Sequence, residues 1–261
     1  MDPYYQDDHV TLYHGDCLEV MADLGPAVAD LVFTSPPYNL GVTSGGGFAD
    51  YRKYPDMKAG KWSGGALAHG YEDHDDAMPM AEYEAWQHSV LLACWDALTD
   101  DGAIFYNHKP RVQSGELWTP LRLNPGLPLR QIVVWARAGG MNFAPTHYVP
   151  THEWIMVLAR PTWRLKSKGA SGLGDVWQVP QVSGSAHPAP FPEALPERAI
   201  ESSGATSVLD PFAGSGTTLL AAKNAGIRAI GIERSERYCE MTAERLGAFI
   251  PAPDSLFGGA L

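Results

Sequence analysis

The chain has 261 residues, which is enough for one large domain with a substantial hydrophobic core. Its net charge of -11 at pH 7 argues against a protein that coats nucleic acid without sequence preference, because such affinity comes largely from neutralised phosphates. A local basic face is still expected, since basic residues are concentrated in three stretches, 52–61, 109–137 and 160–168. No apolar run approaches the length of a membrane span, so we expect a soluble, cytoplasmic protein without a signal peptide.

The three cysteines, Cys17, Cys94 and Cys239, are an odd number and lack the spacing of metal ligands. Each lies in an apolar or helical context. We therefore expect buried, reduced thiols rather than a disulfide or a zinc site, and we expect no metal.

The first predicted elements are a strand over 10–13 and a short helix over 17–24 that ends before Gly25-Pro26. Asp16 lies between them. An acidic residue at this position caps a helix, and it also stands at a strand end, where a ligand could reach it. The two roles are compatible.

A buried strand over 29–34 is followed by Thr34-Ser35-Pro36-Pro37-Tyr38-Asn39. The two prolines forbid both helix and ladder pairing, so the strand must stop there. Open α/β sheets bind ligands at the carboxyl ends of parallel strands, and a rigid step at that point offers acceptor atoms and one aromatic face. A lone Pro-Pro pair is more often a simple turn; a second motif further along the chain changes that balance.

Residues 41–78 show no periodic pattern, and glycines and aromatic residues alternate with charges there. Such a long stretch in one domain indicates a mobile binding loop or an insertion. A helix follows over 80–98 and a strand over 103–106, which leaves Asn107-His108-Lys109 on the same rim as Ser35. These three residues could contact a ligand or form an ordinary loop.

Two β-rich runs over 131–135 and 153–158 predict a late strand pair, whereas 161–185 has no convincing period. Near the C-terminus, a strand over 207–210 leads through Asp210, a glycine turn and a helix over 217–225. This is the layout of a nucleotide-cofactor loop, and the absence of a following lysine excludes a phosphate P-loop. Glu233 ends the next strand, where it could accept both hydroxyls of a ribose or simply begin a helix.

The segments Thr34–Asn39 and Asp210–Thr218 together resemble the two signature motifs of the S-adenosylmethionine-dependent DNA amino-methyltransferases, which methylate adenine N6 or cytosine N4. The motif order resembles the beta arrangement of that family. The resemblance implies a Rossmann-like α/β methyltransferase fold in one domain, 1–261, with a mixed seven-stranded sheet, helices on both faces and a circularly permuted motif order. In such a sheet, the strands at 208–210 and 228–232 join those at 10–13 and 30–34 from the other end of the chain.

The resemblance also implies two groups of site residues. In the catalytic group, Ser35 and the Pro36 carbonyl accept the amino hydrogens of the base, Pro37 stiffens the step, and Tyr38 stacks on a base flipped out of the helix. The cofactor group is Asp16, His187, Pro188, Asp210, Phe212, Ala213, Gly214, Ser215, Gly216, Thr217 and Glu233. Phe191 stands where many family members carry lysine in the segment around His187, so only a packing role is expected of that segment.

Ser-Pro-Pro-Tyr is typical of cytosine-N4 enzymes, which favours cytosine over adenine N6 as the target. One other interpretation is a protein or RNA methyltransferase, but the serine and the motif order count against it. A second is a catalytically silent DNA-binding relative. The expected partners are S-adenosylmethionine, which is converted to S-adenosylhomocysteine, and double-stranded DNA. A homodimer and a cognate restriction endonuclease are further candidates. The protein would then work at the nucleoid of a bacterium, encoded by the cell or a phage, and we expect sequence recognition in 41–78 and 137–186.

Overall fold

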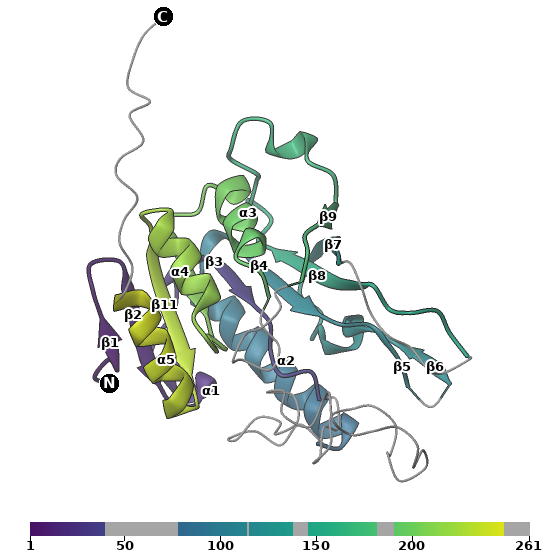
Figure 1. The fold of residues 1–261 in the computed structure, drawn as a ribbon, viewed down its shortest axis with the longest axis horizontal. Helices are drawn as coiled ribbons and strands as arrows, with labels where there is room; N and C mark the ends of the chain where they lie inside the picture. The colour runs from purple at the N-terminus through teal and green to yellow at the C-terminus, as the bar shows by residue number, and fades with distance from the viewer. Residues whose placement is uncertain (40–77, 114, 138–145, 182–190, 248–261) are drawn as a thin grey trace, which may run out of the picture.

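A nine-stranded mixed sheet forms the centre of the structure, in the order β1-β2-β11-β10-β3-β4-β8-β7-β9 (Figure 1). The computed structural model describes residues 1–39, 78–113, 115–137, 146–181 and 191–247. The parallel strands are β2 (Val10–His14), β11 (Arg228–Glu233), β10 (Ser207–Asp210), β3 (Ala29–Thr34) and β4 (Leu98–His108).

The remaining strands complete the sheet at its edges. β8 (His152–Ala159) runs antiparallel to β4, and β7 (Leu129–Ala136) runs antiparallel to β8. The expected seven strands are all present, and the count rises to nine because β1 (Tyr5–Gln6) and β9 (Val176–Gln178) add at the edges. Both are too short to carry a sequence period. β5 (Arg111–Gln113) and β6 (Glu116–Trp118) form a separate hairpin, followed by the 3-10 turn η4 (Pro120–Leu123).

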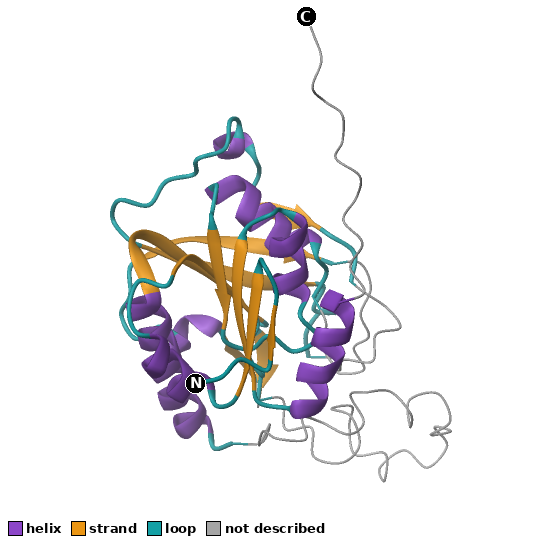
Figure 2. Cartoon of the chain, turned by 90° about the vertical axis from the view of Figure 1, so that its left-hand side faces the viewer, coloured by secondary structure: helices purple, strands orange, loops and turns teal. Residues whose placement is uncertain are grey.

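Helices cover both faces of the sheet (Figure 2). One face carries α1 (Cys17–Leu24) and α2 (Met80–Ala97), and the other carries α3 (Ala194–Ser203), α4 (Thr217–Asn224) and α5 (Glu236–Gly247). Because side chains alternate along a strand, Leu31 and Phe33 enter the core under α3 and α4, whereas Val32 enters the core under α2. The sheet is thus buried on both sides, which explains the continuous apolar runs in its central strands.

The two ends of the chain meet in the middle of the sheet, as the permuted order predicts. β11 pairs in parallel with β2, with Glu233 opposite His14, and β10 pairs in parallel with β3. The glycine loop after β10 and the proline step after β3 therefore begin side by side, at the carboxyl ends of two neighbouring parallel strands. We call this side of the sheet its carboxyl edge. The predicted permuted order of strands in a mixed α/β sheet is therefore confirmed.

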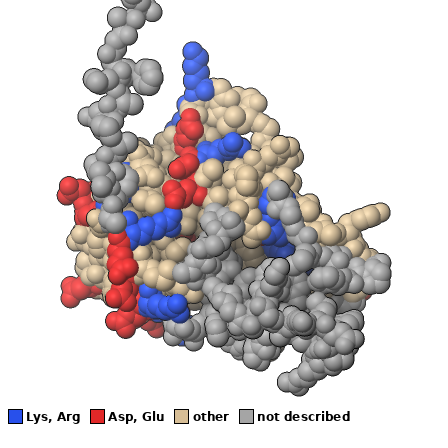
Figure 3. Space-filling view, in the orientation of Figure 1, with Lys and Arg blue, Asp and Glu red and all other residues tan. Residues whose placement is uncertain are grey.

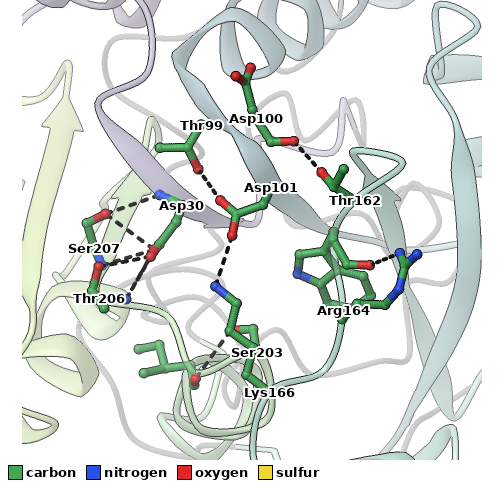
Figure 4. A network of polar contacts seen from close by, with 12 residues as sticks. Asp30, Thr99, Asp100, Asp101, Thr162, Arg164, Lys166, Ser203, Thr206 and Ser207 are labelled. Carbon is green, nitrogen blue, oxygen red and sulfur yellow. Dashed lines mark hydrogen bonds and ion pairs between the residues drawn. The ribbon is translucent and has the colours of Figure 1, made fainter.

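Polar contacts join the strands at their amino ends, on the opposite edge of the sheet from the glycine loop and the proline step (Figure 4). The Asp30 carboxylate accepts hydrogen bonds from the backbone amides of Thr206 and Ser207, at 2.9 and 3.0 Å, which ties β3 to β10. Lys166 pairs with Asp101 at 3.1 Å, which fastens the segment after β8 to the start of β4. These contacts fix the relative positions of the strands whose other ends carry the candidate site.

All three cysteines are buried and free, as the sequence predicts. Burial raises the pKa of the Cys17 and Cys239 thiols to about 12, so they are not nucleophiles at neutral pH. Among the helices of the described ranges, none is long and apolar enough to cross a membrane. The segment 161–185, which shows no period, contains the turn η5 (Ala170–Gly172) and the edge strand β9.

Candidate active site

The proline step begins where β3 ends. Thr34 is the last residue of the strand, and Ser35, Pro36 and Pro37 follow without any strand pairing. Both prolines are buried, whereas Ser35 and Tyr38 are half-buried at the carboxyl edge of the sheet. Asn39 then turns the chain with a positive φ of 52°.

The glycine loop lies beside this step, between β10 and α4. Gly216 has a φ of +76°, and a Cβ atom there would lie 2.6 Å from Cγ2 of Thr242 on α5. The loop carbonyls are held from the same helix, because Thr242 Oγ1 donates to the Gly214 carbonyl at 2.9 Å and Arg245 donates to the Ser215 carbonyl at 2.9 Å. Only glycine fits at Gly216, because the loop turns there with a positive φ and packs directly against α5.

Asp210 connects the two motifs. Its fully buried carboxylate accepts hydrogen bonds from Thr34 Oγ1 at 2.8 Å and from Thr218 Oγ1 at 2.7 Å. It also accepts from the Phe212 amide at 3.1 Å. Burial raises the pKa of this carboxyl to about 6. Asp210 therefore fixes the start of the proline step against the start of α4.

Glu233 and Asp16 lie side by side at the same edge. Glu233 accepts from the Gly214 amide at 2.7 Å and from the Ser235 amide at 2.9 Å, and burial raises the pKa of its carboxyl. Gly15 donates to the Glu233 carbonyl at 3.0 Å, which places Asp16 next to it. Asp16 caps α1 through the Leu18 amide at 2.9 Å, so the helix-cap interpretation is confirmed. Each carboxylate keeps lone pairs for further donors.

The other predicted cofactor residues surround the glycine loop or lie outside the described ranges. Phe212 is half-buried and packs edge-on against Trp86, with ring centroids 5.6 Å apart. Ala213 and Thr217 are buried, and Ser215 is half-buried. His187 and Pro188, like residues 41–77 of the predicted loop 41–78, lie outside the described residues.

Two further residues join the proline step, Asn107 on β4 and Glu153 on β8. Tyr38 donates its hydroxyl hydrogen to Glu153 Oε2 at 2.9 Å and lies 2.7 Å from Ser35 Oγ. Asn107 Nδ2 lies 2.7 Å from the Tyr38 hydroxyl and 3.0 Å from Glu153 Oε2. Asn107 was expected on this rim, but the role of Glu153 was not foreseen. The available signal was a charged residue at the start of an otherwise apolar run.

Tyr83 and His108 contact the proline step from the protein core. The Tyr83 hydroxyl donates to the Pro37 carbonyl at 2.7 Å, so its single hydrogen is committed. His108 Nε2 lies 2.8 Å from the same hydroxyl. Burial lowers the pKa of His108 to about 3, so the ring is neutral, and its Nδ1 lies 3.2 Å from the Lys109 carbonyl. The His108 ring also packs against Tyr38, with centroids 4.4 Å apart.

Basic side chains gather at the carboxyl edge of the sheet, although the protein as a whole is acidic. Arg111 donates to the Tyr38 carbonyl at 2.6 Å, and Arg137 pairs with Glu153 Oε1 at 3.3 Å. Burial, together with the nearby charge of Arg137, lowers the pKa of Lys109. In the face seen in Figure 3, acidic side chains gather instead on the side that carries α5.

Comparisons with known proteins match nearly the whole chain. A family model described as a DNA methylase, of the N6/N4 class, matches residues 29–244. The type II methyltransferase M.ScaI of Streptomyces caespitosus is 29% identical over an alignment of 285 positions that covers 94% of this chain and 84% of that protein.

Two solved structures share the fold. The PvuII DNA methyltransferase, described as cytosine-N4-specific, superposes with a TM-score of 0.70 at 19% identity and covers 93% of this chain and 88% of its own. The M1.HpyAVI complex with SAM superposes with a TM-score of 0.59 at 20% identity, covering 90% of this chain and 99% of its own.

Proposed function

The chain belongs to the N6/N4 family of DNA methylases, and we propose that it methylates the N4 amino group of a cytosine that is flipped out of duplex DNA. One observation carries the proposal. The 2.8 Å hydrogen bond from Thr34 to Asp210 joins the proline step to the glycine loop across 176 positions of sequence. A base held at Ser35 would thus lie next to a cofactor held by the glycine loop.

The residues around the glycine loop fit S-adenosylmethionine. Gly216 lets the loop turn tightly against α5, since a Cβ there would clash with Thr242. Glu233 is placed to accept ribose hydroxyls, and Asp16 to accept an adenine amino group. When bound, this cofactor supplies a methyl group on a positively charged sulfur. Asp210 positions the loop from inside the protein, because its carboxylate is fully buried and accepts hydrogen bonds from Thr34 and Thr218.

The proline step supplies acceptors for an amino group. The Pro37 and Tyr38 carbonyls are occupied by Tyr83 and Arg111, whereas the Pro36 carbonyl accepts no hydrogen bond from any residue in the described ranges. The Pro36 carbonyl and Ser35 Oγ together can accept two N–H bonds. They would draw the nitrogen lone pair out of conjugation and stabilise the positive charge that develops on attack. Positioning supplies much of the remaining rate.

The target atom lies inside the helix in duplex DNA, so the base must leave the stack, and Tyr38 offers a ring for it to stack on. Lys109, Arg111 and Arg137 supply positive charge for the adjacent phosphates. The serine in the proline step favours cytosine, and the PvuII enzyme, named as cytosine-N4-specific, shares the fold. A homodimer, a cognate endonuclease and a cytoplasmic location remain predictions.

Mass spectrometry of nucleosides tests the proposal. DNA with varied sequence is incubated with the protein and S-adenosylmethionine and then digested. We expect N4-methyldeoxycytidine, and at least about 100-fold less of it with Ser35→Ala, which removes one acceptor. N6-methyldeoxyadenosine instead would overturn the cytosine assignment. Neither product, with cofactor binding verified, would contradict methylation of DNA and point to another substrate or to a silent relative.

A further inference from the structure

A hydrogen-bonded chain runs from the half-buried Ser35 to the buried carboxylate of Glu153. Its links are Ser35 Oγ to the Tyr38 hydroxyl at 2.7 Å and the Tyr38 hydroxyl to Glu153 Oε2 at 2.9 Å. Glu153 is 5% exposed and Asn107, which braces the chain, is 1% exposed. Burying the Glu153 carboxylate, in the second residue of β8, costs free energy of folding. Its position beside Ser35 and Tyr38 therefore calls for an explanation.

Counting hydrogens gives the chain one direction. A carboxylate only accepts, so the single hydrogen of the Tyr38 hydroxyl points to Glu153. The Tyr38 oxygen must then accept from Ser35, whose own hydrogen is thereby committed. Ser35 Oγ is left with its lone pairs, which suits it to accept a hydrogen from an amino group and not to donate one.

The orientation of the Asn107 amide follows from its surroundings. Its Nδ2 lies 2.7 Å from the Tyr38 hydroxyl, 3.0 Å from Glu153 Oε2 and 3.3 Å from Ser35 Oγ. A flipped amide would set its oxygen against the Glu153 carboxylate and repel it. The buried Asn107 Oδ1 has no hydrogen-bond partner in the part of the chain that the structure describes.

We propose that Glu153 receives the proton released by methyl transfer, through Tyr38 and Ser35, and that it holds Ser35 Oγ as an acceptor. Glu153 is thus a positioning residue and proton acceptor that acts through its neighbours, and the inference rests on the proposed function. Arg137 occupies Oε1 at 3.3 Å and leaves Oε2 to the relay.

The step balances without any further reactant. When the methyl group joins the amino nitrogen, the bond from methyl carbon to sulfur breaks, and its electron pair stays on sulfur. The nitrogen then carries two hydrogens and a positive charge, which makes it a far stronger acid than a carboxylic acid. One N–H proton passes to Ser35 Oγ, the Ser35 proton passes to Tyr38, and the Tyr38 proton passes to Glu153, which becomes neutral. Solvent takes this proton before the next turnover.

A double-mutant cycle tests the relay. Glu153→Gln keeps an acceptor for Tyr38 but removes the basic carboxylate, and Tyr38→Phe removes the hydroxyl but keeps the ring. We expect each to slow single-turnover methyl transfer at least about 100-fold, the range of general acid-base catalysis. Because both break one relay, the double variant should be no slower than the worse single variant. Affinity for S-adenosylmethionine should stay within about twofold of wild type in all three.

Asp7→Asn is the matched control. Asp7 pairs with Lys223 at 2.6 Å and accepts from the Tyr5 hydroxyl at 2.7 Å, which copies the arrangement of Glu153 far from the site. It should lose stability without losing the single-turnover rate. Glu153→Asp keeps a carboxylate and should recover part of the rate lost in Glu153→Gln, which a merely structural side chain would not predict.

Several results would overturn the relay. Wild-type rates in a folded Glu153→Gln protein would do so, as would losses that multiply in the double variant. If Glu153→Gln fails to fold, Tyr38→Phe with an unchanged rate would still refute it. Failure of the proposed function is a separate outcome, since the wild-type protein would then put no methyl group on DNA cytosine.

Discussion

Asp210 keeps a carboxylate entirely inside the protein, with hydrogen bonds to Thr34 and Thr218. Burial raises the pKa of this group from 3.8 to about 6, so the folded protein holds the proton at a pH where the unfolded chain has lost it. Stability contributed by this group is therefore complete below about pH 4 and is lost as the pH rises through about 6. The loss amounts to at most about 3 kcal/mol.

Asp210→Asn should remove this pH dependence. The amide oxygen can still accept from Thr34, and the amide nitrogen can donate to Thr218 Oγ1. Urea unfolding at about pH 4.5 and about pH 7.5 measures the free energy of unfolding of both proteins. We expect Asp210→Asn to gain stability relative to wild type at the higher pH. The same change between the two pH values in both proteins would contradict the assigned cost of this buried charge.

At the scale of elements, the loop before α4 depends on contact with α5. Gly216→Ala would place Cβ 2.6 Å from Thr242, so the loop or α5 must shift. We expect at least about a tenfold loss in affinity for S-adenosylmethionine by calorimetry, about 1.4 kcal/mol. Gly226→Ala is the control, because Gly226 has a φ of +68° with nothing within 4 Å of its Cβ position. It should cost about 1 kcal/mol of stability and leave affinity unchanged. Equal affinity in the Gly216→Ala protein would remove the glycine loop from the cofactor site.

The helix α2 reaches the proline step through one hydroxyl. Tyr83→Phe removes the hydroxyl that contacts the Pro37 carbonyl and His108 Nε2, which should cost about 1–3 kcal/mol for each buried group and should slow methyl transfer by misplacing the proline step. Tyr106→Phe is matched, since Tyr106 donates to Gln87 at 2.7 Å within the same core. The Tyr106→Phe protein should lose a similar amount of stability and keep the wild-type rate of methyl transfer. Equal rates in the two variants, measured alongside urea unfolding, would show that Tyr83 only stabilises the fold.

The elements that the sequence predicts well are those with a period or a motif of their own. The helices at 17–24 and 80–97, and the strands ending in Thr34 and Asp210, satisfy local rules of spacing and turn chemistry. Edge strand β9 has three residues and exists because it pairs with β7. Its formation depends on tertiary contacts, which no local pattern records.

The same distinction applies to the site. Ser35, Tyr38 and the glycine loop belong to contiguous motifs, so their proximity follows from two parallel strands ending at one edge. Glu153 reaches that edge only because β8 runs antiparallel to β4, with His108 opposite Trp154. Its partners Tyr38 and Asn107 lie 115 and 46 positions away, and their contact depends on strand register.

For the whole molecule, an acidic protein that binds DNA must concentrate its positive charge. Lys109 lies at the carboxyl edge of the sheet, so Lys109→Gln should weaken DNA binding for all sequences alike. It should also reduce the slope of log affinity against log salt by about 0.9 for one lost phosphate contact. Lys166→Gln, at the opposite edge in Figure 4, removes the same charge and should leave the slope unchanged. Equal slopes for Lys109→Gln and wild type in a fluorescence titration would place the DNA elsewhere.

Site-specific methylation of cytosine N4 is tested most directly by single-molecule sequencing of DNA from a bacterial host that lacks its own methylases and expresses this chain. We predict N4-methylcytosine at one short recurring sequence, with no modification when the host expresses Ser35→Ala. Modified adenine at a recurring sequence would contradict the cytosine assignment. Unmodified DNA in cells that contain the folded wild-type protein would contradict the account as a whole.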